Sequence, residues 1–166
     1  MSMRVAIRYQ SRGGHVKEMA ELVSEGTGVE AISIDDPRAP ITEPVDVLFI
    51  GGALYKFALD PGMEEYLKNL PADMVGKAVT FGSSALTRRP IFIIQERLRD
   101  KGISVHPSAV YMRGKPKPYL REIMPDWAKR EARNIEKEFA EAADEDEADV
   151  EALPETAEQS ENQTEE

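Results

Sequence analysis

The chain has 166 residues, the length of one ordinary domain, and it contains no cysteine. Disulfides, thiol catalysis and cysteine-bound metals are therefore excluded, and two histidines far apart in sequence (His15 and His106) give no reason to expect a metal site. The formal net charge is −10, but it is unevenly distributed. We expect a cytoplasmic protein without a membrane segment, because no apolar run approaches ~20 residues and no signal-peptide pattern opens the chain.

The acidity belongs to the end of the chain. Residues 141–166 hold twelve of the 31 acidic residues and no Lys or Arg, which leaves 19 acids against 21 bases, about +2, in residues 1–140. Without a basic excess, nucleic-acid binding is disfavoured. A segment of this composition buries too little apolar surface to offset its ordering entropy. We therefore predict a folded domain over 1–140 and a disordered acidic tail over 141–166, serving either solubility or a partner.

The first half of the chain alternates strands and helices. A strand over 4–9 precedes a glycine-containing turn and a helix over 14–25, which Gly26 and Gly28 are expected to close. A second strand covers 29–34, a proline-broken connection covers 35–44, and a third strand covers 45–50 and ends in two glycines. A helix starts at Pro61 and continues through Leu70.

The second half repeats the alternation. A fourth strand is predicted over 77–81, followed by Gly82 and two serines, and a helix over 90–101. A fifth strand lies within 104–112, interrupted by Pro107, and a long last helix ends near Ala140. Apolar, continuous strands of this kind suit a parallel sheet covered on both faces. The order predicts a doubly wound α/β fold, whose ligands bind beyond the carboxyl ends of the strands.

The turn between the first strand and first helix is a physical anion site. Free N–H groups of a first helical turn point out of the helix end, where the helix dipole favours negative charge. The same kind of turn also joins strands to helices in proteins that bind nothing. Phosphorelay chemistry is disfavoured, because the third strand ends in Gly51 and Gly52 without an acceptor aspartate.

Three segments resemble the flavodoxin-like family: residues 9–20 (YQSRGGHVKEMA), 47–55 (VLFIGGALY) and 79–84 (VTFGSS). The resemblance covers roughly residues 3–140. It implies a flavodoxin-like three-layer sandwich with a five-stranded parallel sheet in order 2-1-3-4-5. It also implies FMN as cofactor on the loops after the first, third and fourth strands. The residues it assigns to the cofactor are Ser11, Arg12, Gly13, Gly14, His15, Val16, Gly52, Ala53, Leu54, Tyr55, Gly82, Ser83, Ser84 and Ala85.

The phosphate loop departs from the family pattern, which places three hydroxyls around a glycine. Ser11 keeps the first, but Gly13 and Val16 occupy the other two positions, and Val16 can donate only its backbone N–H. Charge-assisted hydrogen bonds contribute ~1.5–3 kcal/mol each, so phosphate affinity is expected to fall. Arg12 or His15 offers compensating positive charge.

For three further features near the proposed cofactor site, the sequence allows both a functional and a structural interpretation. Tyr55, preferred over Phe57, either stacks on a flavin or packs over the sheet end. Arg8, at the end of the first strand, either reaches the phosphate or pairs with a carboxylate such as Asp46. The basic, proline-rich loop 113–119 either contacts a redox partner, an anionic substrate or the acidic tail, or is a solvated loop.

The sequence therefore favours an FMN-binding redox protein, either an electron carrier or a small flavin-dependent oxidoreductase, with a flavin cofactor and a redox partner protein. No catalytic acid or nucleophile is evident. The alternative is a flavodoxin-like module that has lost tight FMN binding and serves as an interaction or regulatory domain.

Overall fold

The computed structural model describes residues 3–55, 57–85, 87 and 89–152, with side chains described as far as residue 148. Within it, the chain divides into two units, residues 1–132 and 133–166. The first unit contains the whole sheet. In the part of the chain that the structure describes, no helix combines the length and apolar character needed to cross a bilayer.

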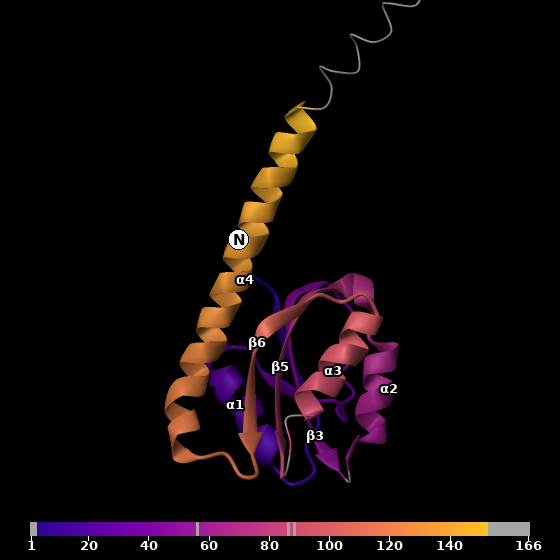
Figure 1. Cartoon of the computed structure of the whole chain (residues 1–166), viewed down its shortest axis with the longest axis vertical. Coiled ribbons are helices and arrows are strands. Elements are labelled where there is room, and N and C mark those ends of the chain that lie inside the picture. Colours follow the sequence, from indigo (N-terminus) through magenta and orange to yellow (C-terminus); the bar gives the residue numbers. More distant parts are fainter. Residues whose placement is uncertain (1–2, 56, 86, 88, 153–166) are drawn as a thin grey trace, which may run out of the picture. The chain divides into compact units, whose positions relative to one another are not determined.

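Five parallel strands form the sheet, in the spatial order β2-β1-β3-β5-β6 (Figure 1). They are β1 (Val5–Tyr9), β2 (Ala31–Ser33), β3 (Val45–Tyr55), β5 (Val75–Ser84) and β6 (Val105–Arg113). If only these five parallel strands are numbered along the chain, their spatial order is 2-1-3-4-5, as predicted. The predicted flavodoxin-like fold class is therefore confirmed. Pro107 lies in the edge strand β6, where the pairing register with β5 shifts.

Both central strands run further than the sequence predicts. Gly51, Gly52 and Gly82 lie inside the paired strands β3 and β5, not in turns after them. A Cβ at Gly82 would lie 2.6 Å from the carbonyl oxygen of Gly52, so this position accepts only glycine without a backbone shift. The short strand β4 (Ala58–Leu59), which the sequence analysis missed, pairs antiparallel with the end of β3.

Helices cover both faces of the sheet (Figure 1). The helices α2 (Pro61–Asn69) and α3 (Arg89–Asp100) cover one face, where Leu48 and Ile50 of β3 share a buried cluster with Met63 and Ile94. The helix α1 (His15–Thr27) and the start of α4 (Pro118–Ala152) cover the other face. Trp127 of α4 meets Phe49 of β3 there edge to face, with ring centres 6.0 Å apart. A 3₁₀ turn, η1 (Ala72–Met74), leads into β5.

Gly26 does not end α1, contrary to the prediction that it would help close the helix. It lies inside the helix, whose C-cap is Gly28 at φ 74°. A Cβ at Gly26 would lie 2.0 Å from the carbonyl oxygen of Pro125 in α4. The missing side chain therefore lets the backbones of α1 and α4 approach closely.

The prediction that the last helix ends near Ala140 is wrong, because α4 continues to Ala152. The segment is rich in alanine and glutamate, two strong helix formers, and this local propensity outweighs the charge density that predicted disorder. Residues 153–166 lie outside the described residues. The domain boundary at residue 140 stays a prediction.

Arg8 does not pair with Asp46, the carboxylate named in the prediction. Its guanidinium is buried, and Nε donates to the carbonyl oxygen of Ala39 at 2.7 Å, while Nη1 donates to that of Ile7 at 3.0 Å. The Tyr66 hydroxyl donates to the same Ala39 oxygen at 2.7 Å. Asp46 instead accepts from the N–H of Arg4 at 2.8 Å. Arg8 therefore fastens the loop after β2 through carbonyl dipoles.

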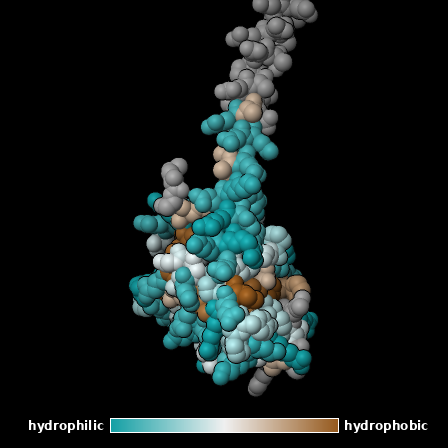
Figure 2. Space-filling view, turned by 90° about the vertical axis from the view of Figure 1, so that its left-hand side faces the viewer, coloured by the Kyte–Doolittle hydropathy of each residue, from teal (hydrophilic) through white to brown (hydrophobic). Residues whose placement is uncertain are grey.

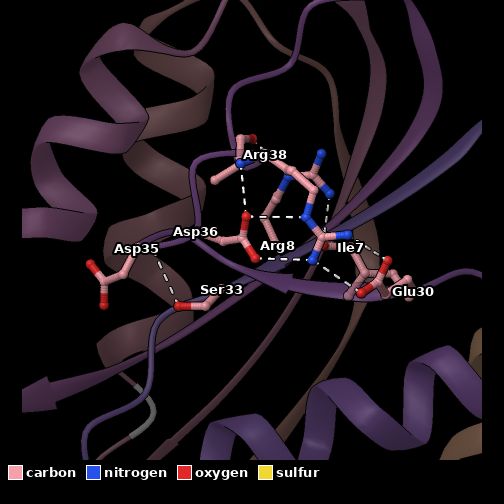
Figure 3. A network of polar contacts seen from close by, with 8 residues as sticks. Ile7, Arg8, Glu30, Ser33, Asp35, Asp36 and Arg38 are labelled. Atoms are coloured by element: carbon pink, nitrogen blue, oxygen red, sulfur yellow. Dashed lines mark hydrogen bonds and ion pairs between the residues drawn. The ribbon is translucent and has the colours of Figure 1, made fainter.

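A second arginine orders the same loop (Figure 3). Arg38 binds the carboxylates of Asp36 and Glu30 at distances of 3.0–3.2 Å. Side-chain and backbone hydrogen bonds from Arg38 hold the pKa of Asp36 below its usual value. All these contacts serve the loop itself, so the structure gives Arg8 and Arg38 a structural role.

We expect the substitution Gly26→Ala to destabilise the protein, although alanine is the better helix former. The new methyl group would meet the Pro125 backbone, and overpacking of this kind costs about 1–3 kcal/mol. The Tm, measured by differential scanning calorimetry, should fall by roughly 2–4 °C per kcal/mol. The control is Glu25→Ala on the exposed side of the same helix, which should leave Tm nearly unchanged. An unchanged or higher Tm for Gly26→Ala would contradict the close α1–α4 contact.

Candidate functional site

The carboxyl ends of β1, β3 and β5 lie side by side, at the lower edge of the sheet in Figure 1. The cause is the parallel register, which pairs Tyr9 with Gly51 and Gly51 with Phe81. The three predicted segments, residues 11–16, 52–55 and 82–85, therefore meet at one edge. Edges of this kind are where doubly wound folds place ligands.

The loop between β1 and α1 is ordered by hydrogen bonds within itself. The N–H of Gly14, which has φ 89°, donates to Ser11 Oγ at 3.1 Å. The first bond of the helix runs from Glu18 N–H to the Gly14 carbonyl oxygen at 3.0 Å. The N–H groups of His15, Val16 and Lys17 consequently have no acceptor within the helix.

The space over this loop is open. A Cβ built at Gly13 or at Gly14 would meet no atom within 4 Å. The Ser11 hydroxyl accepts one hydrogen bond and keeps its own proton to donate. Val16 is different, because its side chain is 1% exposed and packs in the core with Met19 and Val23. Only its backbone N–H is available to a ligand.

Arg12 is bound within the site and not free for a phosphate. Its Nε donates to Asp60 Oδ2 at 2.8 Å, its Nη2 contacts the same oxygen, and its guanidinium carbon lies 4.2 Å from the centre of the Tyr55 ring. Its backbone N–H donates to the Tyr55 hydroxyl at 2.9 Å. One residue thus joins the glycine loop, the end of β3 and the start of α2.

Asp60 is a residue of this site that was not predicted from the sequence, although its position carries a recognisable signal. Asp60 directly precedes Pro61 and is the N-cap of α2, accepting the N–H of Gly62 at 2.7 Å. Burial raises the pKa of this carboxyl, but hydrogen bonds from the Arg12 side chain and the Gly62 N–H outweigh burial. The net pKa of Asp60 lies below its usual value, so the carboxylate keeps its charge beside Arg12.

The two candidate aromatic residues occupy different environments. Tyr55 ends β3, is half-buried, and has its hydroxyl committed to the Arg12 N–H. Phe57 lies in the turn between β3 and β4 at φ 68°, with 67% of its surface exposed. A positive φ at a bulky residue is strained, and such residues collect at ligand sites. Phe57 is thus the freer ring.

The segment after Phe81 is more ordered than a free loop. Gly82 and Ser83 pair with β3, and Ser83 Oγ donates to the Gly114 carbonyl oxygen at 2.7 Å. The N–H of Thr87 donates to Ser84 Oγ at 3.3 Å, and Arg113 Nε donates to the Ala85 carbonyl oxygen at 3.1 Å. The predicted end of this strand at residue 81 was too early, because β5 extends through Ser84. Arg88, in the same segment, lies outside the described residues.

Gln10 is a further polar residue that the sequence analysis did not single out. It follows β1 directly, donates its N–H to the Gly51 carbonyl oxygen at 3.0 Å, and is 5% exposed. Its Oε1 is buried without a hydrogen-bond partner among the described residues. A buried unsatisfied amide costs about 1–3 kcal/mol, so a water or a ligand that hydrogen-bonds to this oxygen would be stabilised here.

These features fit a flavin phosphate and fit the flavin ring only in part. The phosphate would meet three backbone N–H groups, the Ser11 hydroxyl and the open space over Gly13 and Gly14. The ring would meet Tyr55 or Phe57, with no second aromatic residue on the segment after β5. The residues present therefore suit a phosphate-bearing ligand with one flat apolar group.

Comparison with known proteins identifies the fold. No protein-family model matches the sequence. A flavodoxin from the domain Archaea is similar over 81% of this chain and 99% of its own, with 19% identity and a TM-score of 0.70. A flavodoxin, WrbA-like protein from Agrobacterium tumefaciens is similar over 82% and 99%, with 16% identity and a TM-score of 0.66.

A third solved structure contains the same architecture as part of a larger chain. Rubredoxin oxygen:oxidoreductase from Desulfovibrio gigas is similar over 82% of this chain but only 37% of its own, with 17% identity and a TM-score of 0.70. The chain therefore has a flavodoxin-like fold, and its structural neighbours include flavodoxins of about its own length and one part of a longer oxidoreductase chain.

We expect Asp60→Asn to lower stability at neutral pH by about 0.5–1 kcal/mol. Asparagine keeps the N-cap but loses the charge that pairs with the half-exposed Arg12. Because the folded pKa of Asp60 is lowered, this contribution is complete above the unfolded value near ~3.9 and disappears as pH falls through the folded value. Urea unfolding of both proteins between about pH 7 and pH 2.5 checks this. A difference that stays constant across that range would contradict the ion pair.

Proposed function

We propose that the protein binds FMN at the carboxyl edge of the sheet and is a flavin-dependent redox protein. The observation that carries this proposal is the open loop over 11–16, with three helix N–H groups and the Ser11 hydroxyl available in a flavodoxin-like fold. The location of the loop at the switch point between β1 and β3 supports it.

In this proposal the chain binds the phosphate mainly through its backbone. The N–H groups of His15, Val16 and Lys17 and the dipole of α1 attract the dianion, and Ser11 donates one side-chain hydrogen bond. Arg12 helps to hold the loop in place but adds little positive charge for the phosphate, because Asp60 neutralises its guanidinium. Asp60 and Tyr55 hold the loop in the binding shape before the ligand arrives, which lowers the ordering cost.

The ring would lie beyond the ends of β3 and β5. Tyr55 is the proposed stacking residue, and Phe57 is the alternative because it is more exposed. Backbone groups of Gly52–Tyr55 and Gly82–Ala85 would border the ring and exclude water from its edge. When bound, the flavin supplies one- or two-electron chemistry, and the protein contributes binding, orientation and electrostatics. Electron transfer and small-molecule oxidoreduction both fit this arrangement.

A second candidate function is a flavodoxin-like interaction or regulatory module without tight FMN binding. Two observations favour it: the Val16 side chain is in the core, and the Arg12 charge is paired with Asp60. Both reduce the number of charged or hydroxyl contacts that a phosphate can receive. The two functions differ in a single measurable property, the affinity for FMN relative to riboflavin.

We expect the purified protein to bind FMN with a Kd below about 1 µM and to bind riboflavin more weakly, because riboflavin lacks the phosphate. The substitution Ser11→Ala should weaken FMN binding roughly 10–100-fold, the value of one charge-assisted hydrogen bond, and leave riboflavin binding unchanged. Flavin fluorescence quenching measures both affinities. The matched control is Ser33→Ala, since Ser33 Oγ also accepts a turn N–H but belongs to the end of β2, outside the glycine loop.

Absence of saturable FMN binding in the wild-type protein would contradict the redox function and favour the interaction module. Equal binding of FMN and riboflavin would mean that the phosphate loop takes no part.

The stacking residue can be assigned by two single substitutions. We expect Tyr55→Leu to weaken riboflavin binding about 3–10-fold, because an aromatic stack contributes ~0.5–1.5 kcal/mol beyond area burial. FMN binding should weaken more, because the Tyr55 hydroxyl also holds the phosphate loop through the Arg12 N–H. Phe57→Leu in the same titration is the comparison. If only Phe57→Leu weakens both flavins, the freer ring of the β3–β4 turn is the stacking residue and Tyr55 is structural.

A further inference from the structure

The side of the first unit formed by β6 and its flanking helices carries an apolar groove. The groove has a volume of about 440 Å³ and lies over the open edge of β6, between α3 and the start of α4. Three large apolar side chains around it are unusually exposed: Phe92 at 61%, Tyr119 at 52% and Ile123 at 53%. Figure 2 shows apolar surface gathered in a strip on an otherwise hydrophilic face. Exposed apolar patches with polar rims mark binding sites for other molecules.

The chain around this groove is cationic, although the whole protein is acidic. Residues 75–95 and 101–121 contain no Asp or Glu. Four exposed cations lie on these segments at the carboxyl end of β6 and the start of α3: Arg89, Arg113, Lys115 and Lys117. Among the described residues, none of the four forms an ion pair with a carboxylate. The nearest acids along the chain are Glu96 and Glu122, beyond the two segments.

The cationic rim is fastened to the candidate flavin site. Gly114 N–H donates to the Ser84 carbonyl oxygen at 3.0 Å, and Ser83 Oγ donates to the Gly114 carbonyl oxygen at 2.7 Å. Arg113 reaches the Ala85 carbonyl oxygen. A molecule seated on the groove and rim would therefore lie beside the segment 82–85, the third loop of the candidate site.

We propose that this groove and its cationic rim are the docking surface for an acidic redox protein, an inference that rests on the proposed function. The positive charge of the rim decides between a second copy of this chain and an acidic partner. A second copy placed face to face would bring eight unpaired cations together, whereas an acidic protein neutralises the four on this surface. Apolar contacts with Phe92 and Ile123 supply the buried centre, and the lysines and arginines supply the polar rim.

The test uses an acidic plant-type [2Fe–2S] ferredoxin as the probe and basic cytochrome c as its opposite in charge. Binding of oxidised ferredoxin to the flavin-free full-length protein is measured by isothermal titration calorimetry. We expect saturable binding that weakens at least 10-fold between about 0.05 M and 0.5 M salt. The double substitution Lys115→Glu with Lys117→Glu should weaken it at least 10-fold, and Phe92→Ala about 5–10-fold. Cytochrome c should bind better to the charge-reversed protein than to the wild type.

The control is Lys68→Glu, an equal change of charge per residue on the exposed side of α2. An equal loss of ferredoxin binding in the control, or no loss in the double variant, would overturn the docking surface. Dimerisation of the protein alone, detected by analytical ultracentrifugation and abolished by Phe92→Ala, would assign the groove to a second copy and also overturn it. Because binding is measured without flavin, failure here is distinct from failure of the FMN titration.

Discussion

The parallel ladder that joins β1, β3 and β5 is the constraint on which the rest of the molecule depends. It places the ends of three strands, distant in sequence, at one edge, and it brings the glycine loop over 11–16 beside Tyr55 and the segment 82–85. Glycines make the ladder continuous at its end, where the Gly82 position and the Gly52 carbonyl are too close for any side chain. Small residues at these strand ends therefore serve backbone packing first, and any ligand second.

Within that frame, a few polar contacts fix the site before a ligand binds. Arg12, Asp60 and Tyr55 connect the glycine loop, α2 and β3, so the loop does not need ligand binding to order it. Because Arg12 pairs with Asp60, it is not a free cation at the proposed phosphate position. This arrangement explains how a loop with only one hydroxyl could still bind a phosphate, and why the balance between backbone preorganisation and lost side-chain contacts decides the affinity.

The sequence predicted the architecture well and the ends of its elements less well. Apolar runs and turn residues located all five parallel strands, because burial on both faces leaves a strong hydrophobic signal. They did not locate β4, whose two residues are too short for a pattern, or the ends of β3 and β5, because glycines read locally as turns. The high charge density after Ala140 predicted disorder there, whereas the helix propensity of the same residues carries α4 on to Ala152.

The strand order followed from the resemblance to the flavodoxin-like family. The sequence by itself determined the alternation of five strands with helices, the presence of a glycine-rich helix start after β1 and the confinement of acidity to the end of the chain. These are properties of local pattern and composition. Only the tertiary structure decided which polar groups meet: Arg12 with Asp60, Arg8 with the Ala39 carbonyl, and Gly26 with the Pro125 backbone. It also left Gln10 Oε1 without a partner among the described residues. Such pairings depend on distances of a few ångströms between segments far apart in the chain, and no local pattern encodes those distances.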